Sequence, residues 1–341
     1  MSRRVAIVYN EPYHSHYDAV GEEKAVLGVL EAVAAVHQAL LELDYSVIRM
    51  PLPPPLERAA KILRDLDTDI VFNLFEGFDG YPETEAIVTE IISAIGLPST
   101  GCPSSMLRLA LNKAKMKAVL KSALIPTPDF QLLNPETLPL FHLDYPCIVK
   151  PCCEDASHGM SADSIVNNFS ALERQVRFID NTYRGGVLVE KFIDGREFSA
   201  TVLGDSGGTV LPISEIAYSL PPGMPRLLTF AAKWEPSSPY FQGTSPVCPV
   251  DIGDKEREDI SKTALAAFKV LGGVGYARVD MRLDAEGQVN VIEVNPNPDI
   301  SPGYGASRQA EVAGITYPKF IGKIMQLALE KQPPWASASV S

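Results

Sequence analysis

The chain has 341 residues, which is long for a single hydrophobic core and favours roughly two or three domains. Hydrophobic residues make up 46% and charged residues 21%, a balance that excludes a collagen-like or intrinsically disordered chain. The formal net charge of -12 argues against nucleic acid or an anionic membrane as a partner, because both reward a basic surface.

Strands and helices are predicted to alternate along residues 1–102. Apolar runs typical of strands lie at 5–9, 46–50 and 69–74, and amphipathic runs typical of helices lie at 25–43, before Leu66 and at 83–95. This alternation predicts a Rossmann-like parallel α/β domain. No G-x-G-x-x-G run follows a strand, so the dinucleotide-binding fingerprint is missing.

We expect a cytoplasmic protein with no membrane partner. The apolar run after the two N-terminal arginines is too short for a signal peptide. The stretch 25–43 is interrupted by Glu31, His37 and Glu42, which is typical of an amphipathic helix rather than a membrane span. Five cysteines without C-x-x-C spacing indicate reduced thiols.

Residues 103–195 are predicted to form a second unit, a small antiparallel sheet with helices. It begins with a lysine-rich helix at 112–124 and continues with a strand that ends at Lys150. A later helix has a predicted capping box at Ser170–Glu173. Asp194 and Gly195, between two apolar runs, predict a two-residue hairpin turn.

Residues 196–333 are predicted to form a third unit, followed by a disordered tail at 334–341. It contains a loop-rich stretch at 211–249, a helix at 254–272, a hairpin at 276–295 and a closing helix near 318–331.

The hairpin at 276–295 separates polar from apolar side chains. With a simple four-residue turn at 284–287, Leu283 pairs with Gln288, Asp280 with Val291, and Arg278 with Glu293. Alternation then predicts a polar face of Arg278, Asp280, Glu293 and Asn295. The opposite, core face is predicted to hold Val279, Met281, Leu283, Ile292 and Val294.

The polar face of this hairpin suits a divalent metal ion. Asp280 and Glu293 become diagonal neighbours, about 7 to 8 Å apart at Cα. Two carboxylates and the Asn295 amide are hard oxygen ligands, which favour Mg²⁺ carrying nucleotide phosphates over zinc. Pro296 and Pro298 end the strand in an open cleft. From this stretch alone, an ordinary hairpin with a solvated charged face is equally compatible.

Two further stretches favour a nucleotide site, although each is weak alone. Lys150 ends an apolar strand and precedes small and polar residues around Ser157 and Gly159, as a loop that closes over phosphates requires. The run 188–198 offers a strand backbone for a purine edge, and Glu197 lies beyond the predicted turn, where it can accept from ribose hydroxyls.

Taken together, these residues resemble the ATP-grasp superfamily, and within it most closely the D-alanine:D-alanine ligases. The likeness covers nearly the whole chain and is strongest from Asn112 to Asn297. It implies an α/β fold in which a parallel N-terminal domain precedes two α+β subdomains that clamp ATP. It also implies ATP and Mg²⁺, with Mn²⁺ as an alternative ion.

Matching positions imply roles for individual residues. Lys113 and Lys150 match lysines that meet the nucleotide phosphates, 190–193 match the hinge that holds adenine, Glu197 matches the ribose acceptor, and Lys233 matches a lysine at the terminal phosphate. The nucleotide-binding set implied in this way is Lys113, Lys150, Glu190, Lys191, Phe192, Ile193, Glu197, Lys233 and Ile292.

The metal ligands implied by the resemblance are Asp280, Glu293 and Asn295, and the catalytic residues are Arg278, Lys233, Lys150 and Ser157. Arg278 matches the arginine that stabilises the reacting oxygens. The implied reaction joins amino acids or small carboxylates through an acyl phosphate and releases ADP and phosphate. The resemblance also implies a homodimer. A ligase with a thiol or carrier-bound acceptor and a catalytically silent nucleotide-binding scaffold are the alternatives.

The departures from the D-alanine ligase pattern lie on the amino-acid side. The loop expected to close over the phosphates, residues 150–161, is called the lid. It has Asp155 where those enzymes have glycine and Ala156 where they have serine, and Trp234 replaces a tyrosine. Their substrate-binding glutamate has no clear counterpart. Glu22 or Glu23 could substitute for it, but the favoured interpretation of these two residues is a carboxylate at a helix start, near the helix macrodipole. Other positions considered on this side or in the lid are Asn73, Glu76, His14, His16, Cys152 and Cys153.

The run 72–80 could place Asn73 and Glu76 at a strand end that faces the cleft, although an arrangement away from the cleft is also compatible with it. His14 and His16 are expected in a solvated or substrate-facing loop rather than a metal site. For the two lid cysteines, no nearby lysine or helix start that lowers their pKa is apparent.

Overall fold

The computed structural model describes residues 2–11, 28–78, 80–154, 157–183, 185–205 and 207–330. The expectations for the tail and for several site-side residues fall outside these ranges. These residues are His14, His16, Glu22, Glu23, Asp155, Ala156 and 334–341. Within the described ranges, no helix is both long and apolar enough to cross a membrane.

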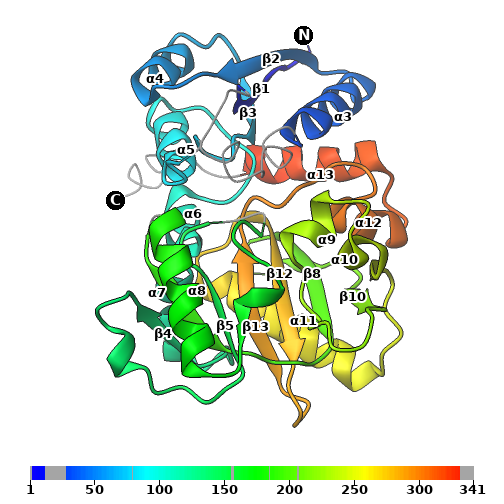
Figure 1. Ribbon diagram of the computed structural model, residues 1–341. Coiled ribbons are helices and arrows are strands. Elements are labelled where there is room, and N and C mark those ends of the chain that lie inside the picture. The colour runs from blue at the N-terminus through cyan, green and yellow to red at the C-terminus, as the bar shows by residue number, and fades with distance from the viewer. Residues whose placement is uncertain are drawn as a thin grey trace, which may run out of the picture.

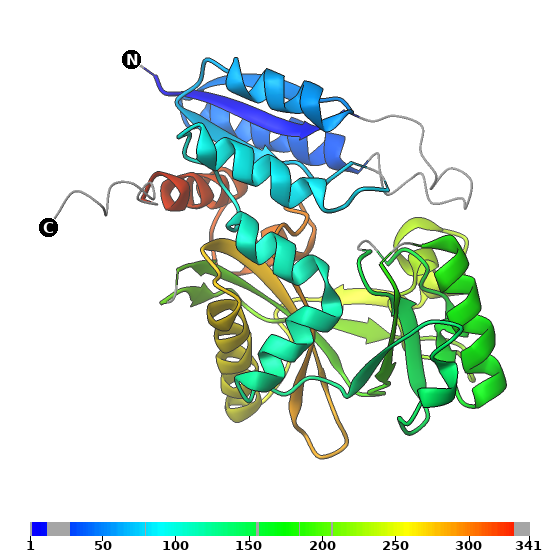
Figure 2. The same ribbon diagram turned by 90° about the vertical axis from the view of Figure 1, so that its left-hand side faces the viewer.

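The N-terminal part is a three-stranded parallel sheet in the order β2-β1-β3, as the sequence predicts. Its strands are β1 (Arg4–Asn10), β2 (Ser46–Leu52) and β3 (Ile70–Leu74). The helices are α3 (Val29–Glu42), α4 (Leu56–Arg64) and α5 (Thr84–Ala94). Side chains alternate across β1, so that Val5 and Ile7 pack in the cluster with α3, whereas Val8 packs with α4 and α5. Figure 2 shows helices flanking this sheet.

A four-stranded antiparallel sheet follows in the order β4-β7-β5-β6. Its strands are β4 (Phe130–Leu133), β5 (Cys147–Pro151), β6 (Ile165–Val166) and β7 (Val187–Lys191), with short 3-10 turns at Leu138–Leu140 and Ala162–Ser164. Helix α8 (Phe169–Thr182) packs on it. The side chain of Asn168 accepts from Ala171 N at 2.9 Å, so the capping box predicted at Ser170 is wrong and the helix begins earlier.

The largest sheet has six antiparallel strands in the order β11-β10-β8-β12-β13, with β9 beside β8. They are β8 (Glu197–Gly204), β9 (Thr209–Val210), β10 (Ser214–Tyr218), β11 (Thr244–Val247), β12 (Gly275–Leu283) and β13 (Val289–Asn295). Its core face packs against α6 (Ser104–Leu111), α7 (Lys113–Ser122) and α11 (Asp254–Val270).

The stretch 211–249 is more ordered than its loop-rich sequence predicts. Besides β10 and β11 it contains α9 (Phe230–Trp234) and α10 (Pro239–Gln242). Eight prolines between residues 211 and 249 disguise the strands, and Pro246 itself lies in β11 at the edge of the sheet.

The predicted hairpin turn at Asp194 and Gly195 is wrong. β7 belongs to the four-stranded sheet and β8 to the six-stranded sheet, so the chain crosses between sheets here. Glycine is required at 195 because the backbone of Leu283 passes close to it, not because of a turn. A Cβ atom on residue 195 would lie 1.6 Å from the carbonyl oxygen of Leu283.

The register of the β12–β13 hairpin also differs from the prediction. Leu283 pairs with Val289 instead of Gln288, because the Asp284 side chain accepts from Gln288 N at 2.8 Å and lengthens the turn. A β-bulge then inserts Ile292, so that Asp280 lies opposite Glu293 and Arg278 opposite Asn295. The two carboxylates are therefore direct partners rather than diagonal neighbours.

The C-terminal helices return to the N-terminal sheet. After α12 (Gly305–Val312), helix α13 (Tyr317–Glu330) packs against α3 in one apolar cluster that also contains Tyr276 of β12 (Figure 1). This packing fixes the three-stranded sheet relative to the six-stranded one. The domain limits predicted at residues 102 and 195 stay predictions.

Candidate active site

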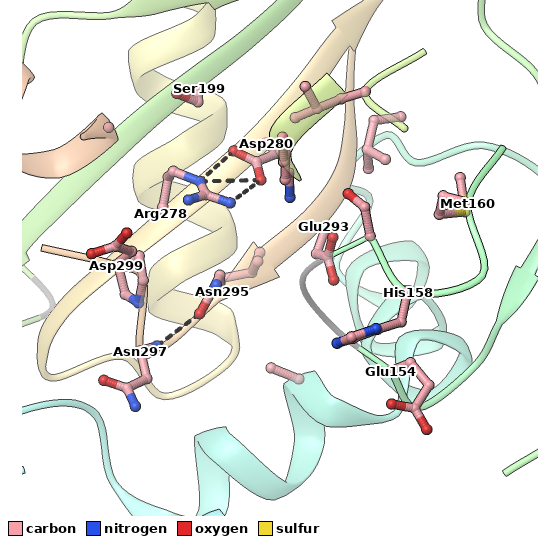
Figure 3. A pocket seen from close by; sticks show the side chains of 18 of the residues that line it. Glu154, His158, Met160, Ser199, Arg278, Asp280, Glu293, Asn295, Asn297 and Asp299 are labelled. Carbon is pink, nitrogen blue, oxygen red and sulfur yellow. Dashed lines mark hydrogen bonds and ion pairs between the residues drawn. The ribbon is translucent and has the colours of Figure 1, made fainter. Parts of the chain in front are cut away.

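A cavity with a volume of about 720 Å³ is lined by segments from all three sheets. Each of the fourteen predicted site residues lies in its wall: Lys113, Lys150, Ser157, Glu190, Lys191, Phe192, Ile193, Glu197, Lys233, Arg278, Asp280, Ile292, Glu293 and Asn295. Figure 3 shows Arg278, Asp280, Glu293 and Asn295 on one side of this cavity and the lid residues Glu154, His158 and Met160 on the other.

The bulge in β13 explains the place of Ile292. The prediction that it faces the core with Val294 is wrong, because the extra residue turns the Ile292 side chain toward the cavity wall. Val289, Val291 and Val294 remain in the core under the sheet. The hairpin therefore presents an apolar side chain beside its polar ones.

Arg278 and Asp280 form a two-pronged ion pair on the floor of the cavity. Arg278 Nε donates to Asp280 Oδ1 and Nη2 donates to Oδ2, both at 2.9 Å. The charge of Asp280 raises the pKa of Arg278 despite burial. Asn295 lies across the strand pair, and its Oδ1 accepts from Asn297 N at 2.9 Å.

Glu293 pairs with a lysine from the start of α7. Lys113 Nζ lies 2.8 Å from Glu293 Oε1 and also donates to the carbonyl of Glu154 in the lid. Burial alone would raise the pKa of Glu293, but the charges of Lys113 and Lys150 outweigh it and lower this pKa to about 2. The Glu293 carboxylate is therefore ionised at neutral pH.

Glu190 is buried between two lysines. Its Oε2 lies 3.2 Å from Lys150 Nζ, and its Oε1 lies 3.2 Å from Lys117 Nζ, close enough for an ion pair though not aligned as a hydrogen bond. Lys117 Nζ donates to Thr127 Oγ1 at 2.9 Å. The side chain of Glu190 thus orients Lys150 toward the cavity.

Lys117 is a residue that the sequence interpretation missed. Burial lowers its pKa to about 8, although the nearby Glu190 charge opposes the shift. A signal was present, since Lys113 and Lys117 are four residues apart and share one face of a predicted helix.

The hinge at 190–193 offers a single unpaired backbone donor. Lys191 N donates to Asp129 O at 2.8 Å and Phe192 N donates to Pro146 O at 2.9 Å. Over the described part of the chain, no group accepts from the N–H of Ile193, which lines the cavity. One donor at a strand end is suited to a ring nitrogen of a purine.

The lid meets α9 above the cavity. Phe230 N donates to Met160 O at 3.1 Å, and the rings of His158 and Phe230 have centroids 5.9 Å apart. The same helix carries Lys233, whose pKa is lowered by burial and then by Arg278. Two segments, which connect strands within two different sheets, therefore contact each other at the cavity that Lys150 and Lys233 line. His158 and Met160 were not predicted.

On the amino-acid side, one of the two residues considered for the cleft faces the cavity. Glu76 lines it, but Asn73 does not. The Asn73 side chain is buried, donating to Thr89 Oγ1 at 3.1 Å and accepting from Phe75 N at 3.2 Å. Its role is to fix the end of β3, and the possible placement of Asn73 at the cleft is wrong.

The expectation that no nearby lysine or helix start lowers the cysteine pKa is wrong for Cys152, whereas the pKa of Cys153 is raised, chiefly by its contact with the Cys152 thiol. Cys152 lies against the start of α7, where its carbonyl accepts from Lys113 N at 3.1 Å and its thiol contacts Asn112 Oδ1 at 3.6 Å. Contact with the Cys153 thiol, the α7 backbone and the nearby lysines lower the pKa of Cys152 to about 6 against the effect of burial.

The hairpin residues fit a magnesium ion. Among the described residues, no group of three or more His, Cys, Asp and Glu is placed to hold a metal. Asp280, Glu293 and Asn295 instead supply two carboxylates and an amide. The side chain of Asp280 is 19% exposed and that of Glu293 is 28% exposed. Hard oxygen donors in a partly open site are what Mg²⁺ prefers when it is shared with phosphates.

Comparison with known proteins decides the family. The sequence profile described as "D-ala D-ala ligase C-terminus" matches residues 118–326. The chain belongs to the D-Ala-D-Ala ligase-like family of ATP-grasp proteins. Family members are ATP-dependent ligases, and this ATP-grasp ligase shares their assignment as an enzyme that forms carbon–nitrogen bonds.

Individual relatives agree with this family. The ligase is 32% identical to the uncharacterized protein y4sG of Sinorhizobium fredii over 81% of this chain and 77% of that protein. It is 27% identical to a D-alanine--D-alanine ligase of Actinobacillus succinogenes, covering 88% and 92%. A D-alanine--D-alanine ligase structure from Bacillus anthracis superposes with a TM-score of 0.74 at 22% identity, covering 96% and 98%, which shows the shared fold.

Proposed function

We propose that this ATP-grasp ligase joins the carboxyl group of an amino acid or small carboxylate to the amine of a second amino acid, releasing ADP and phosphate. The observation that carries this proposal is the convergence of all fourteen predicted site residues on one cavity between three sheets. D-Alanine is the first substrate to test, because relatives are named D-alanine--D-alanine ligases.

In the first step, the substrate carboxylate attacks the γ-phosphoryl group of ATP, which gives an acyl phosphate and ADP. The hinge at 190–193 holds the adenine, and Lys113, Lys150 and Lys233 spread the charge of the transferred group. Glu190 supports this step because its buried carboxylate fixes Lys150 at 3.2 Å.

Asp280, Glu293 and Asn295 would hold Mg²⁺, with Mn²⁺ as an alternative. When bound, the ion supplies charge neutralisation at the phosphates. The low pKa of Glu293 keeps one ligand ionised in the absence of the ion.

In the second step, the amine attacks the acyl carbon and phosphate leaves. Arg278 and backbone N–H groups of residues 299–303 would stabilise the oxyanion, a contribution of about 3 kcal/mol per donor. Within this loop, Ser301 N already donates to Asp299 Oδ1 at 2.7 Å, which holds the loop in shape. The loop at 150–161, with Ser157, excludes water from the acyl phosphate, and its contact with Phe230 supports that role.

The test is an ADP-release screen of D and L amino acid pairs in which the products are weighed. We expect ADP release that needs both substrates, with a product mass equal to the two substrates minus water. Glu293→Gln should reduce turnover at least about 100-fold by loss of a charged ligand. Glu286→Gln is the matched control, because Glu286 lies in the exposed turn of the same hairpin.

Full turnover by Glu293→Gln would remove the metal assignment. A product with a thiol or carrier-bound acceptor, or ATP binding without phosphate release across the panel, would contradict the proposal in favour of the alternatives. The cytoplasmic location and the homodimer stay predictions.

A further inference from the structure

Arg282, which the proposed reaction does not use, lies where three segments meet. Its side chain is 5% exposed and projects from β12. Its Nη1 donates to Ile193 O of the hinge at 2.8 Å, and its Nη2 donates to Arg226 O of the strap, residues 219–229, at 2.7 Å. The guanidinium carbon also lies 5.1 Å from the centre of the Phe192 ring.

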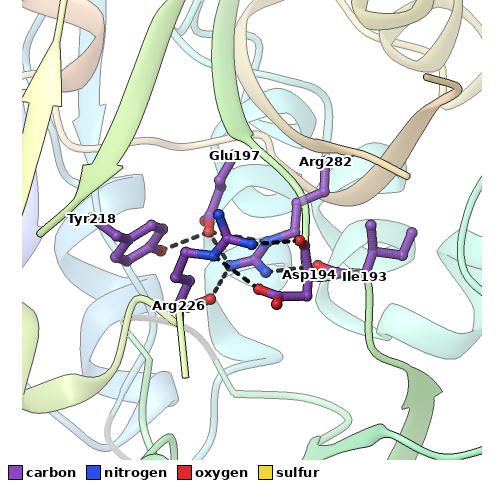
Figure 4. A network of polar contacts seen from close by, with 6 residues as sticks. All are labelled: Ile193, Asp194, Glu197, Tyr218, Arg226 and Arg282. Carbon is purple, nitrogen blue, oxygen red and sulfur yellow. Dashed lines mark hydrogen bonds and ion pairs between the residues drawn. The ribbon is translucent and has the colours of Figure 1, made fainter. Parts of the chain in front are cut away.

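The same guanidinium binds Glu197, as Figure 4 shows. Arg282 Nε donates to Glu197 Oε2 at 3.1 Å, and Nη2 donates to that same oxygen. Tyr218 OH is a third donor to Oε2, at 2.7 Å. In the described ranges, Oε1 of Glu197 receives no hydrogen bond, and Glu197 lines the cavity.

This asymmetry has a direct chemical consequence. A carboxylate has two oxygens that can each accept about two hydrogen bonds. Three donors on Oε2 saturate that oxygen and fix the rotation of the carboxylate, which leaves Oε1 as the acceptor for a hydroxyl group. Burial lowers the pKa of Arg282, but the charge of Glu197 together with the contacts to Tyr218 more than offsets it, so the pKa of Arg282 is raised.

We propose that Arg282 and Tyr218 are positioning residues that orient Glu197 for the ribose hydroxyls of ATP. The inference rests on the proposed function, in which Glu197 accepts from the ribose. Arg282 also donates to Ile193 O of the hinge, so the same side chain that orients Glu197 is itself held by the backbone beside it.

A purely structural role for Arg282 predicts a different result. If the side chain only held the three segments together, its replacement would weaken every nucleotide equally. If it orients Glu197, its replacement weakens only nucleotides that carry the hydroxyl which Glu197 binds.

The experiment compares dissociation constants of ATP, 2′-deoxyATP and 3′-deoxyATP by calorimetry in the presence of Mg²⁺. We expect the wild-type protein to prefer ATP by about tenfold over at least one deoxy analogue, as a hydrogen bond to a charged acceptor provides. Arg282→Lys cannot bridge the same acceptors and should reduce this preference to less than about twofold, with the affinity for that deoxy analogue unchanged.

Tyr218→Phe provides a second test that keeps the buried charges intact. Removing one of three donors to Oε2 should lower the preference two- to threefold, again without weakening the deoxy analogue. Arg196→Lys is the matched control, because the Arg196 guanidinium forks onto Glu215 at 2.7 Å and makes no hydrogen bond to the Glu197 carboxylate. Thermal melting confirms that each variant is folded.

The outcomes separate the two proposals. A wild-type protein that binds no ATP would contradict the proposed function itself. The inference is overturned if the wild-type protein binds ATP no more tightly than either deoxy analogue. It is also overturned if folded Arg282→Lys prefers ATP over the deoxy analogue as strongly as the wild type does. If Arg282→Lys does not fold, an unchanged preference in Tyr218→Phe overturns it.

Discussion

At the residue scale, the amine of Lys117 is a charge that burial disfavours. It is fully buried, and its pKa falls from 10.5 to about 8 because burial disfavours the charged form. Its partners Glu190 and Thr127 recover only part of that cost. The lysine is retained where it braces the carboxylate that orients Lys150.

This shift predicts a pH dependence of stability. Between about pH 8 and 10.5 the unfolded state holds more of the Lys117 proton than the folded state, so the free energy of unfolding rises with pH. The stability that comes from having Lys117 neutral is lost as pH falls through about 8. Its full size is about 3 kcal/mol in the free energy of unfolding. Urea unfolding at several pH values measures this effect. The free energy of unfolding of the wild type, relative to that of Lys117→Met, should increase as the pH rises from about 8 to 10.5.

Lys121→Met is the control for this measurement. The Lys121 amine is 42% exposed beside Asp129, so its difference from wild type should change much less with pH. A Lys117→Met difference that stays constant from pH 7.5 to 10 would contradict the account of this charge.

At the element scale, the crossing between β7 and β8 depends on one glycine. Gly195→Ala would place a Cβ atom 1.6 Å from Leu283 O, so the crossing or the end of β12 has to move. We expect a loss of more than about 3 kcal/mol in the free energy of unfolding, measured by urea titration.

Gly322→Ala is the contrasting substitution. Its Cβ atom would sit 3.4 Å from Leu43 Cδ1, an ordinary contact, inside helix α13. Because alanine favours a helix, stability should rise by about 0.5 to 1 kcal/mol. Equal effects at Gly195 and Gly322 would show that the close approach to Leu283 is not what requires Gly195.

The lid depends on a glycine as well. Gly159 has φ +72°, and a Cβ atom on it would lie 2.9 Å from Tyr183 Cε2 and 3.1 Å from Ile179 Cδ1, so the lid rests tightly on α8. Gly159→Ala should therefore displace the lid and lower kcat/KM for ATP at least about tenfold, in line with losses from misplaced site residues. Steady-state kinetics measure this loss.

The matched variant for the lid is Gly287→Ala. Gly287 has a similar φ of +79° but no atom within 4 Å of its Cβ position, and it lies in the turn of the β12–β13 hairpin. Both variants carry the backbone strain, at about 1 to 2 kcal/mol, but only the lid variant should slow the reaction. Equal kcat/KM values in the two variants would refute the role of lid packing.

At the scale of the whole molecule, local patterns predicted the elements and non-local contacts did not follow from them. The alternation in residues 1–102 predicted the parallel sheet because β1 and β3 are short buried runs, while β2 at the edge is a short run that is mostly not buried. The bulge at Ile292 and the crossing at Gly195 were missed because each depends on atoms from a distant strand or turn. A two-residue period alone does not reveal an inserted residue.

The candidate site shows the same division. Residues at the ends of apolar strands, such as Lys150 and Glu293, could be selected because a polar side chain at that point is unusual. Arg282 could not, since charged residues on a strand usually face water, and for Lys117 the only signal was its four-residue spacing from Lys113. Their partners Glu197 and Glu190 come from other segments, and only the fold brings them together.

The measurement that tests the central claim most directly is a crystal structure of this ligase with a non-hydrolysable ATP analogue and Mn²⁺, whose anomalous signal locates the ion. The account predicts the ion about 2.0 to 2.3 Å from oxygens of Asp280, Glu293 and Asn295 and in contact with the phosphates. An ion or a triphosphate bound away from these three side chains would contradict it.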